Sequence, residues 1–132
     1  MSGTTANLGN AGDAFDTAND GIVIVSNLET IPGGKTLDTT GFSPAVIPAG
    51  HLVIEETATG VLKPMPVSGT AYGTLPANHT YKGVVVSSVL TTKPFVAVMV
   101  RGTVNKNASK YAIASVLSAV RTALPLIRFT QD

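Results

Sequence analysis

Valine and other apolar residues form a nearly continuous run late in the chain. Residues 95–105 read FVAVMVRGTVN, with a polar interruption at Arg101-Gly102. An unbroken apolar run of this length is typical of a strand that is buried on both faces. Gly102 within it indicates a bulge or a close approach of another backbone. We therefore expect Arg101 to point outward, where it is available to an interface with a partner.

A helical pattern follows this strand. Apolar side chains recur at the spacing of one helix face, at Ile113, Val116, Leu117, Val120 and Leu124. This spacing predicts one principal helix at about residues 107–124 that packs against the sheet. Asn107 or Ser109 is expected to cap its start, and Pro125 to end it.

Upstream of residue 95, glycine and proline divide the chain into short segments that alternate apolar and polar positions. Residues 52–56 and 61–65 flank a glycine-containing turn and predict a β-hairpin. Pro64 and Pro66 place its second strand at a sheet edge. Residues 81–90 predict a strand that pairs antiparallel with 95–104 through a short turn. The loop at 66–80 is expected to hold Tyr72 and His79 as packing or surface residues.

The end of the chain carries a last apolar segment. Leu126, Ile127 and Phe129 predict a final strand that returns to the sheet and is held by burial of these three side chains. Deleting residues 126–132 is therefore expected to destabilise the fold, whereas deleting residues 1–20 is not.

The first 21 residues contain few large apolar side chains and are rich in Gly, Ala, Asn and Thr. Such a segment cannot bury enough surface to offset its ordering entropy, which predicts a mobile N-terminal arm at 1–21, or a simple frayed terminus. The next four residues, Ile22, Val23, Ile24 and Val25, are β-prone. They form either an edge strand of the domain or a strand added to a partner's sheet.

These patterns together predict a mainly β fold with one principal C-terminal helix, in the β-rich α+β class. We expect a single compact domain over residues 22–132, preceded by the mobile arm at 1–21. A chain of 132 residues is long enough for one domain with a hydrophobic core.

Composition narrows the possible partners. Charged residues make up 13% of the chain, about half the usual share. The net charge is +1 and the basic residues form no run, which argues against nucleic acid and anionic membranes. There is no cysteine, hence no disulfide framework. No apolar run reaches the roughly 18 residues of a membrane span, and the polar start of the chain does not read as a signal peptide.

Candidate chemistry is sparse. His51 with Glu55 and Glu56 could suggest metal ligands or acid–base chemistry, but two usable groups on one strand face make a poor site. We interpret them as a solvated hairpin face. Residues 33–36, GGKT, resemble the end of a phosphate-binding loop, but Glu29 stands where that pattern needs another glycine, so a turn is expected. The sequence predicts no enzyme, no cofactor and no metal.

Several segments in order resemble one known family. These are Ile47–Val53, Gly60–Met65, Tyr81–Val85, the block VAVMVRGTVN at 96–105, and the terminal LPLIRF at 124–129. This order is similar to that of the head-decoration proteins of lambda-like tailed phages, over about residues 45–130. The VAVMVRGTVN block and the terminal LPLIRF carry most of the resemblance.

The resemblance implies a compact β-rich domain that forms homotrimers on the outside of a phage capsid. It implies a virion protein, made in the host cytoplasm, whose N-terminal arm orders against the major capsid protein. Ile22, Val23, Ile24, Val25 and Arg101 are then the expected capsid-binding residues. The long segment before the domain departs from the family pattern.

Two other functions stay open. The chain could be a head-fibre base protein, although it is small and lacks a repetitive shaft. It could instead be a soluble β-rich binding module for a small ligand or peptide, which would need an apolar pocket with a few polar groups. The scarcity of aromatic residues argues against the binding-module hypothesis.

Overall fold

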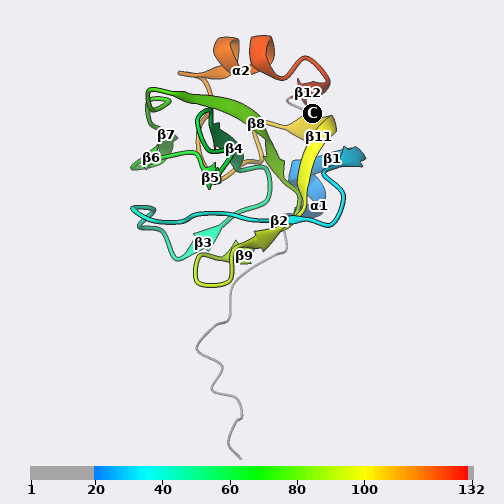
Figure 1. Cartoon of the computed structure of the whole chain (residues 1–132). Coiled ribbons are helices and arrows are strands. Elements are labelled where there is room, and N and C mark those ends of the chain that lie inside the picture. The colour runs from blue at the N-terminus through cyan, green and yellow to red at the C-terminus, as the bar shows by residue number, and fades with distance from the viewer. Residues whose placement is uncertain (1–19, 131–132) are drawn as a thin grey trace, which may run out of the picture.

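A six-stranded sheet forms the centre of the computed structural model, which describes residues 20–130 (Figure 1). Its strands are β1 (Ile24–Thr30), β4 (Leu52–Glu56), β5 (Leu62–Pro64), β8 (His79–Val85), β11 (Val98–Asn105) and β12 (Ile127–Thr130). The main path runs β1-β11-β8-β4-β5, and β12 pairs with β11 off this path. All pairs are antiparallel except β11 with β12, which is parallel.

Three small two-stranded sheets and two helices complete the fold of residues 20–130. β2 (Lys35–Thr36) pairs with β10 (Phe95–Val96), β3 (Val46–Ile47) with β9 (Val89–Leu90), and β6 (Val67–Ser68) with β7 (Ala71–Tyr72). The helices are α1 (Asp20–Val23) and α2 (Leu117–Ala123). The expected class, mainly β with a C-terminal helix, is confirmed. No helix within residues 20–130 is long and apolar enough to cross a membrane.

The central strands are buried on both faces, as expected from their apolar runs. Neighbouring residues alternate between two core clusters: Met99 packs in the larger one and Val98 in the smaller. The same alternation separates Val84 from Val85. The larger cluster also includes Val120 of α2 and Phe129 of β12, whereas the smaller includes Leu37 and Ile47. In Figure 1 α2 accordingly covers one side of the sheet, and β3 and β9 lie on the other.

The principal helix is much shorter than expected. It spans only Leu117–Ala123, its N-cap is Val116, and no side chain caps it, so the expected helix start and the Asn107 or Ser109 cap were wrong. A competing β-bridge explains the difference. Ala112 donates its N–H to the Thr70 carbonyl at 2.9 Å and accepts from the Tyr72 N–H at 3.1 Å.

This bridge holds residues 111–113 extended instead of helical. Tyr111 and Ile113 then both point into the larger core, while Ala112 between them is exposed. Ile113 therefore belongs to a strand-like pattern rather than to the helical one. The end of the helix lies just before Pro125, as expected.

The hairpin of β4 and β5 is confirmed, and β5 is indeed an edge strand of the sheet. The expected strand at 81–90 is instead divided into β8 and β9. β8 pairs with β11 through Val84 with Met99 and Val85 with Val98. Val86 still donates its N–H to the Ala97 carbonyl at 3.1 Å. The chain then leaves the sheet, and the buried Ser88 hydroxyl accepts the Ala49 N–H at 3.0 Å.

The C-terminal strand returns to the sheet as expected. Ile127 and Phe129 are buried, while Arg128 between them is exposed. Leu126 was expected to be buried and is not. It precedes the strand, its side chain faces solvent, and only its backbone carbonyl joins the sheet by accepting the Gly102 N–H at 3.2 Å.

Two glycines mark close approaches between strands. A Cβ on Gly102 would collide with the Ser26 carbonyl oxygen of β1 and with the Met99 sulfur. The pairing of β1 with β11 is also irregular at this point, with a register shift between Asn27 and Glu29. The expected close approach at Gly102 is confirmed. Gly83 is equally constrained, because its Cβ would collide with the Met99 carbonyl oxygen on the neighbouring β11.

Replacing Gly83 by alanine is expected to lower the free energy of unfolding by about 1–3 kcal/mol, because β8 and β11 must move apart to admit the methyl group. Denaturant unfolding measures this loss. Gly21→Ala is the matched control, since nothing lies within 4 Å of its Cβ position. Equal stability of the two variants would contradict the close contact between β8 and β11.

Candidate interaction surfaces

An outer edge of the sheet carries exposed apolar side chains. We call Ile22, Val25 and Leu28 the β1 edge surface; their exposed fractions are 55%, 53% and 63%. β1 is the first strand of the sheet and pairs only with β11, so its other edge is not covered by a strand of residues 20–130. Large apolar groups beside an open strand edge are a favourable site for an added strand.

The start of this surface is fixed to the domain. The Asp20 carboxylate accepts two hydrogen bonds from Ser88, one from its N–H and one from its hydroxyl, each at 2.8 Å. Val23 packs into the larger core with an exposed fraction of 4%. α1 therefore holds the beginning of β1 in place.

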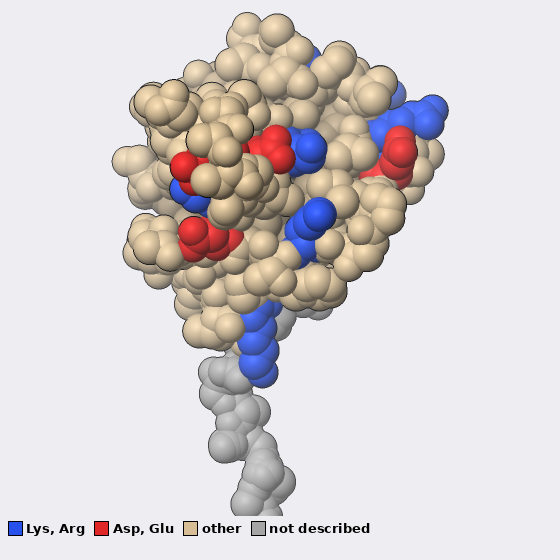
Figure 2. All heavy atoms as spheres, in the orientation of Figure 1, with Lys and Arg blue, Asp and Glu red and all other residues tan. Residues whose placement is uncertain are grey.

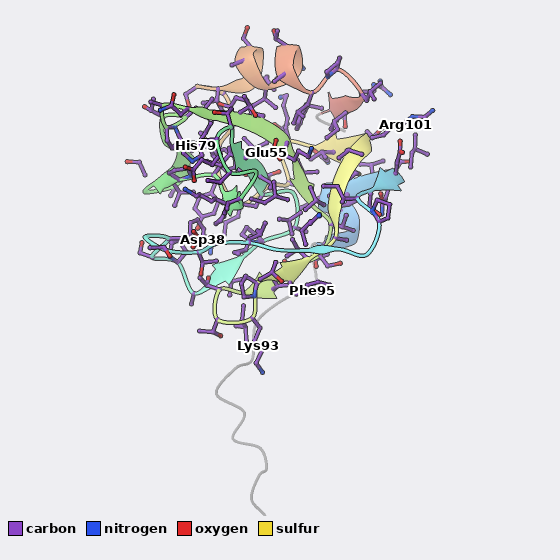
Figure 3. All side chains as sticks on the ribbon, in the orientation of Figure 1. Asp38, Glu55, His79, Lys93, Phe95 and Arg101 are labelled. Carbon is purple, nitrogen blue, oxygen red and sulfur yellow. The ribbon has the colours of Figure 1, made fainter. Side chains whose placement is uncertain are left out.

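The structure separates the five residues expected to bind a partner. Ile22 and Val25 are exposed, and Ile24 is half-buried opposite Val104. Val23 is buried and cannot contact a partner, so this part of the expectation was wrong. Arg101 is exposed and points outward as expected (Figure 3).

Of the segment Ile22–Val25, only the last two residues form the edge strand that was one of the two expectations, and a strand was wrong for the first two. Ile22 and Val23 belong to α1, and Ile24 and Val25 begin β1 on the domain's own sheet. Arg101 lies beside this edge, since its partner across the ladder is Glu29 of β1. Residues 1–19 of the expected arm lie outside the described residues.

Sequence reasoning missed three exposed apolar residues: Leu28, Phe95 and Leu126. Phe95 was read as part of the buried run, but it lies on β10 against Gly34 with its ring largely in solvent. No pattern around Leu28 or Phe95 distinguishes an inward from an outward side chain, because β1 and the passage from β10 to β11 are irregular.

The surface seen in Figure 2 is mostly uncharged. Lys, Arg, Asp and Glu appear there as separate small patches of both signs, with uncharged residues between them. This distribution agrees with the low charged share of the sequence and favours contacts by shape and apolar burial over contacts by strong electrostatic attraction.

His51 is not on a solvated hairpin face, as the sequence suggested. Its exposed fraction is 1%, and it packs edge-on against the rings of Phe42, Tyr72 and Tyr111, with centroids 5.2–5.4 Å away. One ring nitrogen, Nε2, lies 2.9 Å from the Met65 carbonyl oxygen and donates to it. The other, Nδ1, is buried without a hydrogen-bond partner.

This environment excludes an exposed acid–base or metal-binding role for His51. Burial, with a smaller contribution from the positive charge of Lys110, lowers its pKa to about 4, and the Met65 hydrogen bond partly opposes this change. Glu55 and Glu56 are half-buried on β4, and Glu56 pairs with Lys63 at 3.3 Å. Within residues 20–130 no group of three or more acidic or histidine side chains is placed to hold a metal ion.

The GGKT segment forms a turn followed by β2. Gly33 and Gly34 both adopt positive φ, and the Gly34 N–H donates to the Ile31 carbonyl at 3.3 Å. Lys35 and Thr36 then pair with Val96 and Phe95. The turn expected from the sequence is thus confirmed.

Two of the surface hollows of residues 20–130 are further candidate sites. The first, about 410 Å³, lies where the expected helix would have begun and is lined mainly by residues 106–117. The second, about 220 Å³, lies between the loop after β2, the β4–β5 hairpin and the loop before β8. We call the second the Asp38 pocket; its lining residues are Asp38, Thr40, Gly41, Phe42, Ile54, Lys63, Pro64, Pro66, Pro76 and His79.

Comparison with known proteins yielded no match: no protein-family model, curated protein or solved structure matches this chain.

Proposed function

We propose that the protein is a structural virion protein without enzymatic activity that decorates the outer surface of a phage capsid. It acts as a homotrimer that binds neighbouring major capsid protein subunits and holds them together. A protein that binds only the assembled shell stabilises that shell by linkage, by about 2.7 kcal/mol for each site at a hundredfold excess over the dissociation constant.

The β1 edge surface is the observation that carries this proposal. It combines an open strand edge, which offers backbone N–H and C=O groups, with three exposed apolar side chains. A strand of a capsid subunit added there would gain main-chain hydrogen bonds and bury these side chains. The order of the sequence segments that resemble the decoration family supports the same proposal.

The predicted consequence is that Val25→Lys with Leu28→Lys weakens binding to the shell at least tenfold. Each substitution removes apolar burial worth more than 1 kcal/mol and places a charge at the edge, which blocks strand addition. The loss of binding is measured by cosedimentation. The purified protein is mixed with capsid shells from which this protein is absent.

Val61→Lys is the matched control. Val61 is also an exposed apolar residue, but it lies in the β4–β5 hairpin at the other end of the sheet. The double variant and Val61→Lys should both keep the wild-type free energy of unfolding within about 0.5 kcal/mol, because Val25, Leu28 and Val61 are exposed. Failure of the wild-type protein to bind the shells, or equal binding of the double variant, would remove the proposal.

A further inference from the structure

The Asp38 pocket has rigid apolar walls. Phe42 and Ile54 contribute apolar side chains, and Pro64, Pro66 and Pro76 contribute ring surfaces. Because proline fixes its own φ, these walls are held in place before a ligand arrives. A ligand with a flat or extended apolar part would therefore lose little free energy to rearranging the pocket.

The positive charge at the pocket, that of Lys63, is already paired with groups of this protein. The Lys63 ammonium lies 3.3 Å from the Glu56 carboxylate and 3.2 Å from His79 Nε2. His79 Nδ1 lies 2.8 Å from the Ala77 carbonyl and donates to it, which leaves Nε2 as the acceptor for Lys63. Lys63 is thus held by a carboxylate and a ring nitrogen.

The negative charge of Asp38, in contrast, is not paired with a positively charged side chain of residues 20–130. Its Oδ1 accepts both the N–H and the hydroxyl of Thr40, at 3.1 and 2.7 Å. These hydrogen bonds lower the pKa of Asp38, so the carboxylate is ionised at neutral pH, and the more distant Lys63 acts in the same direction. No cation of residues 20–130 lies within ion-pair distance of Asp38, and its Oδ2 is left for a ligand.

From this arrangement we propose that the Asp38 pocket binds an arginine side chain of a partner protein. The guanidinium group donates to Asp38, its flat face lies against Phe42 and the proline rings, and its apolar stem covers the remaining wall. Arginine fits better than lysine because only guanidinium combines a planar stacking face with paired donors.

This site lies apart from the β1 edge surface. β4 and β5 are at the opposite end of the sheet from β1, and Figure 3 shows Asp38 and His79 on the opposite side of the molecule from Arg101. The inference therefore goes beyond the proposed function, and neither depends on the other.

N-acetyl-L-arginine amide, titrated into the isotope-labelled full chain at low salt, tests the proposal. We expect saturable changes in the backbone amide signals of Thr40, Gly41, Phe42 and His79, with a dissociation constant on the order of 1–10 mM. The citrulline analogue has nearly the same shape without the charge and should bind at least tenfold more weakly. The lysine analogue should also bind more weakly than arginine.

Asp38→Asn should weaken arginine binding at least fivefold, whereas Glu55→Gln, a carboxylate substitution on the β4–β5 hairpin outside the pocket, should not. Asp38 is exposed, so the variant is expected to fold. Signal changes spread over other surfaces, equal binding of the citrulline or lysine analogue, or unchanged binding by Asp38→Asn would each overturn the proposal.

Discussion

Replacing Phe129 by alanine is expected to lower the free energy of unfolding by about 3–5 kcal/mol. The ring has an exposed fraction of 6% and packs in the larger core cluster from β12, which is hydrogen-bonded to the end of β11. Domains of this kind have about 5–15 kcal/mol of stability in total, so this loss is a large share of it. Urea denaturation of the two proteins measures the difference.

Arg128→Ala provides the control within the same strand. Its side chain is exposed between two buried neighbours, so the change in stability should stay within about 0.5 kcal/mol. Deleting residues 126–132 removes both Ile127 and Phe129 with the whole of β12, and should abolish the cooperative transition. A Phe129→Ala protein with the wild-type urea midpoint would show that β12 is not part of the folded core.

The second large effect is a loss of stability in acid that depends on His51. The pKa of this residue is about 4 in the folded protein, against 6.5 as its ordinary value. The unfolded chain therefore binds more protons between pH 6.5 and pH 4, and stability falls as the pH falls through that window. From pH 7 to pH 4 the expected loss is about 3 kcal/mol, since one pKa unit corresponds to about 1.4 kcal/mol.

His51→Phe isolates this contribution. The new ring fills the space among Phe42, Tyr72 and Tyr111 but takes up no proton, so the loss between pH 7 and pH 4 should become about 3 kcal/mol smaller. At pH 7 the variant loses about 1 kcal/mol, because the Met65 carbonyl no longer has its donor. Identical pH profiles for His51→Phe and wild type would contradict the account.

Strand positions with strong apolar runs could be predicted from the sequence alone. We expected β11, the β4–β5 hairpin and β12 from the sequence. A strand that is buried on one or both faces has a recognisable pattern of apolar residues in the sequence. The close approach at Gly102 was also predictable, since glycine interrupts a run that otherwise contains valine and threonine. These features depend on local pattern and on the chemistry of single residues.

The start of the helix could not be predicted in the same way. Ile113 fits both a helical face and a strand-like alternation with Tyr111, and only the hydrogen bonds of Ala112 to Thr70 and Tyr72 decide between them. His51 was misplaced for a similar reason. Its burial depends on Tyr72 and Tyr111, which lie far from it in the sequence, as well as on Phe42.

The candidate surfaces were predictable only in part. The apolar segment at Ile22–Val25 was recognised, but whether each side chain faces the core or solvent depends on α1 and on the register shifts of β1. Val23 is buried for this reason, while Leu28 is exposed. The Asp38 pocket brings together three separate segments, so no local pattern reveals it.

The number of copies of this protein in purified virus particles tests the proposed function most directly. Quantitative mass spectrometry of particles from the organism that encodes the chain gives its ratio to the major capsid protein. The account predicts copy numbers comparable to those of the capsid subunit. A few copies in each particle would indicate a vertex or fibre-base role instead, and complete absence from the particles would contradict the proposal.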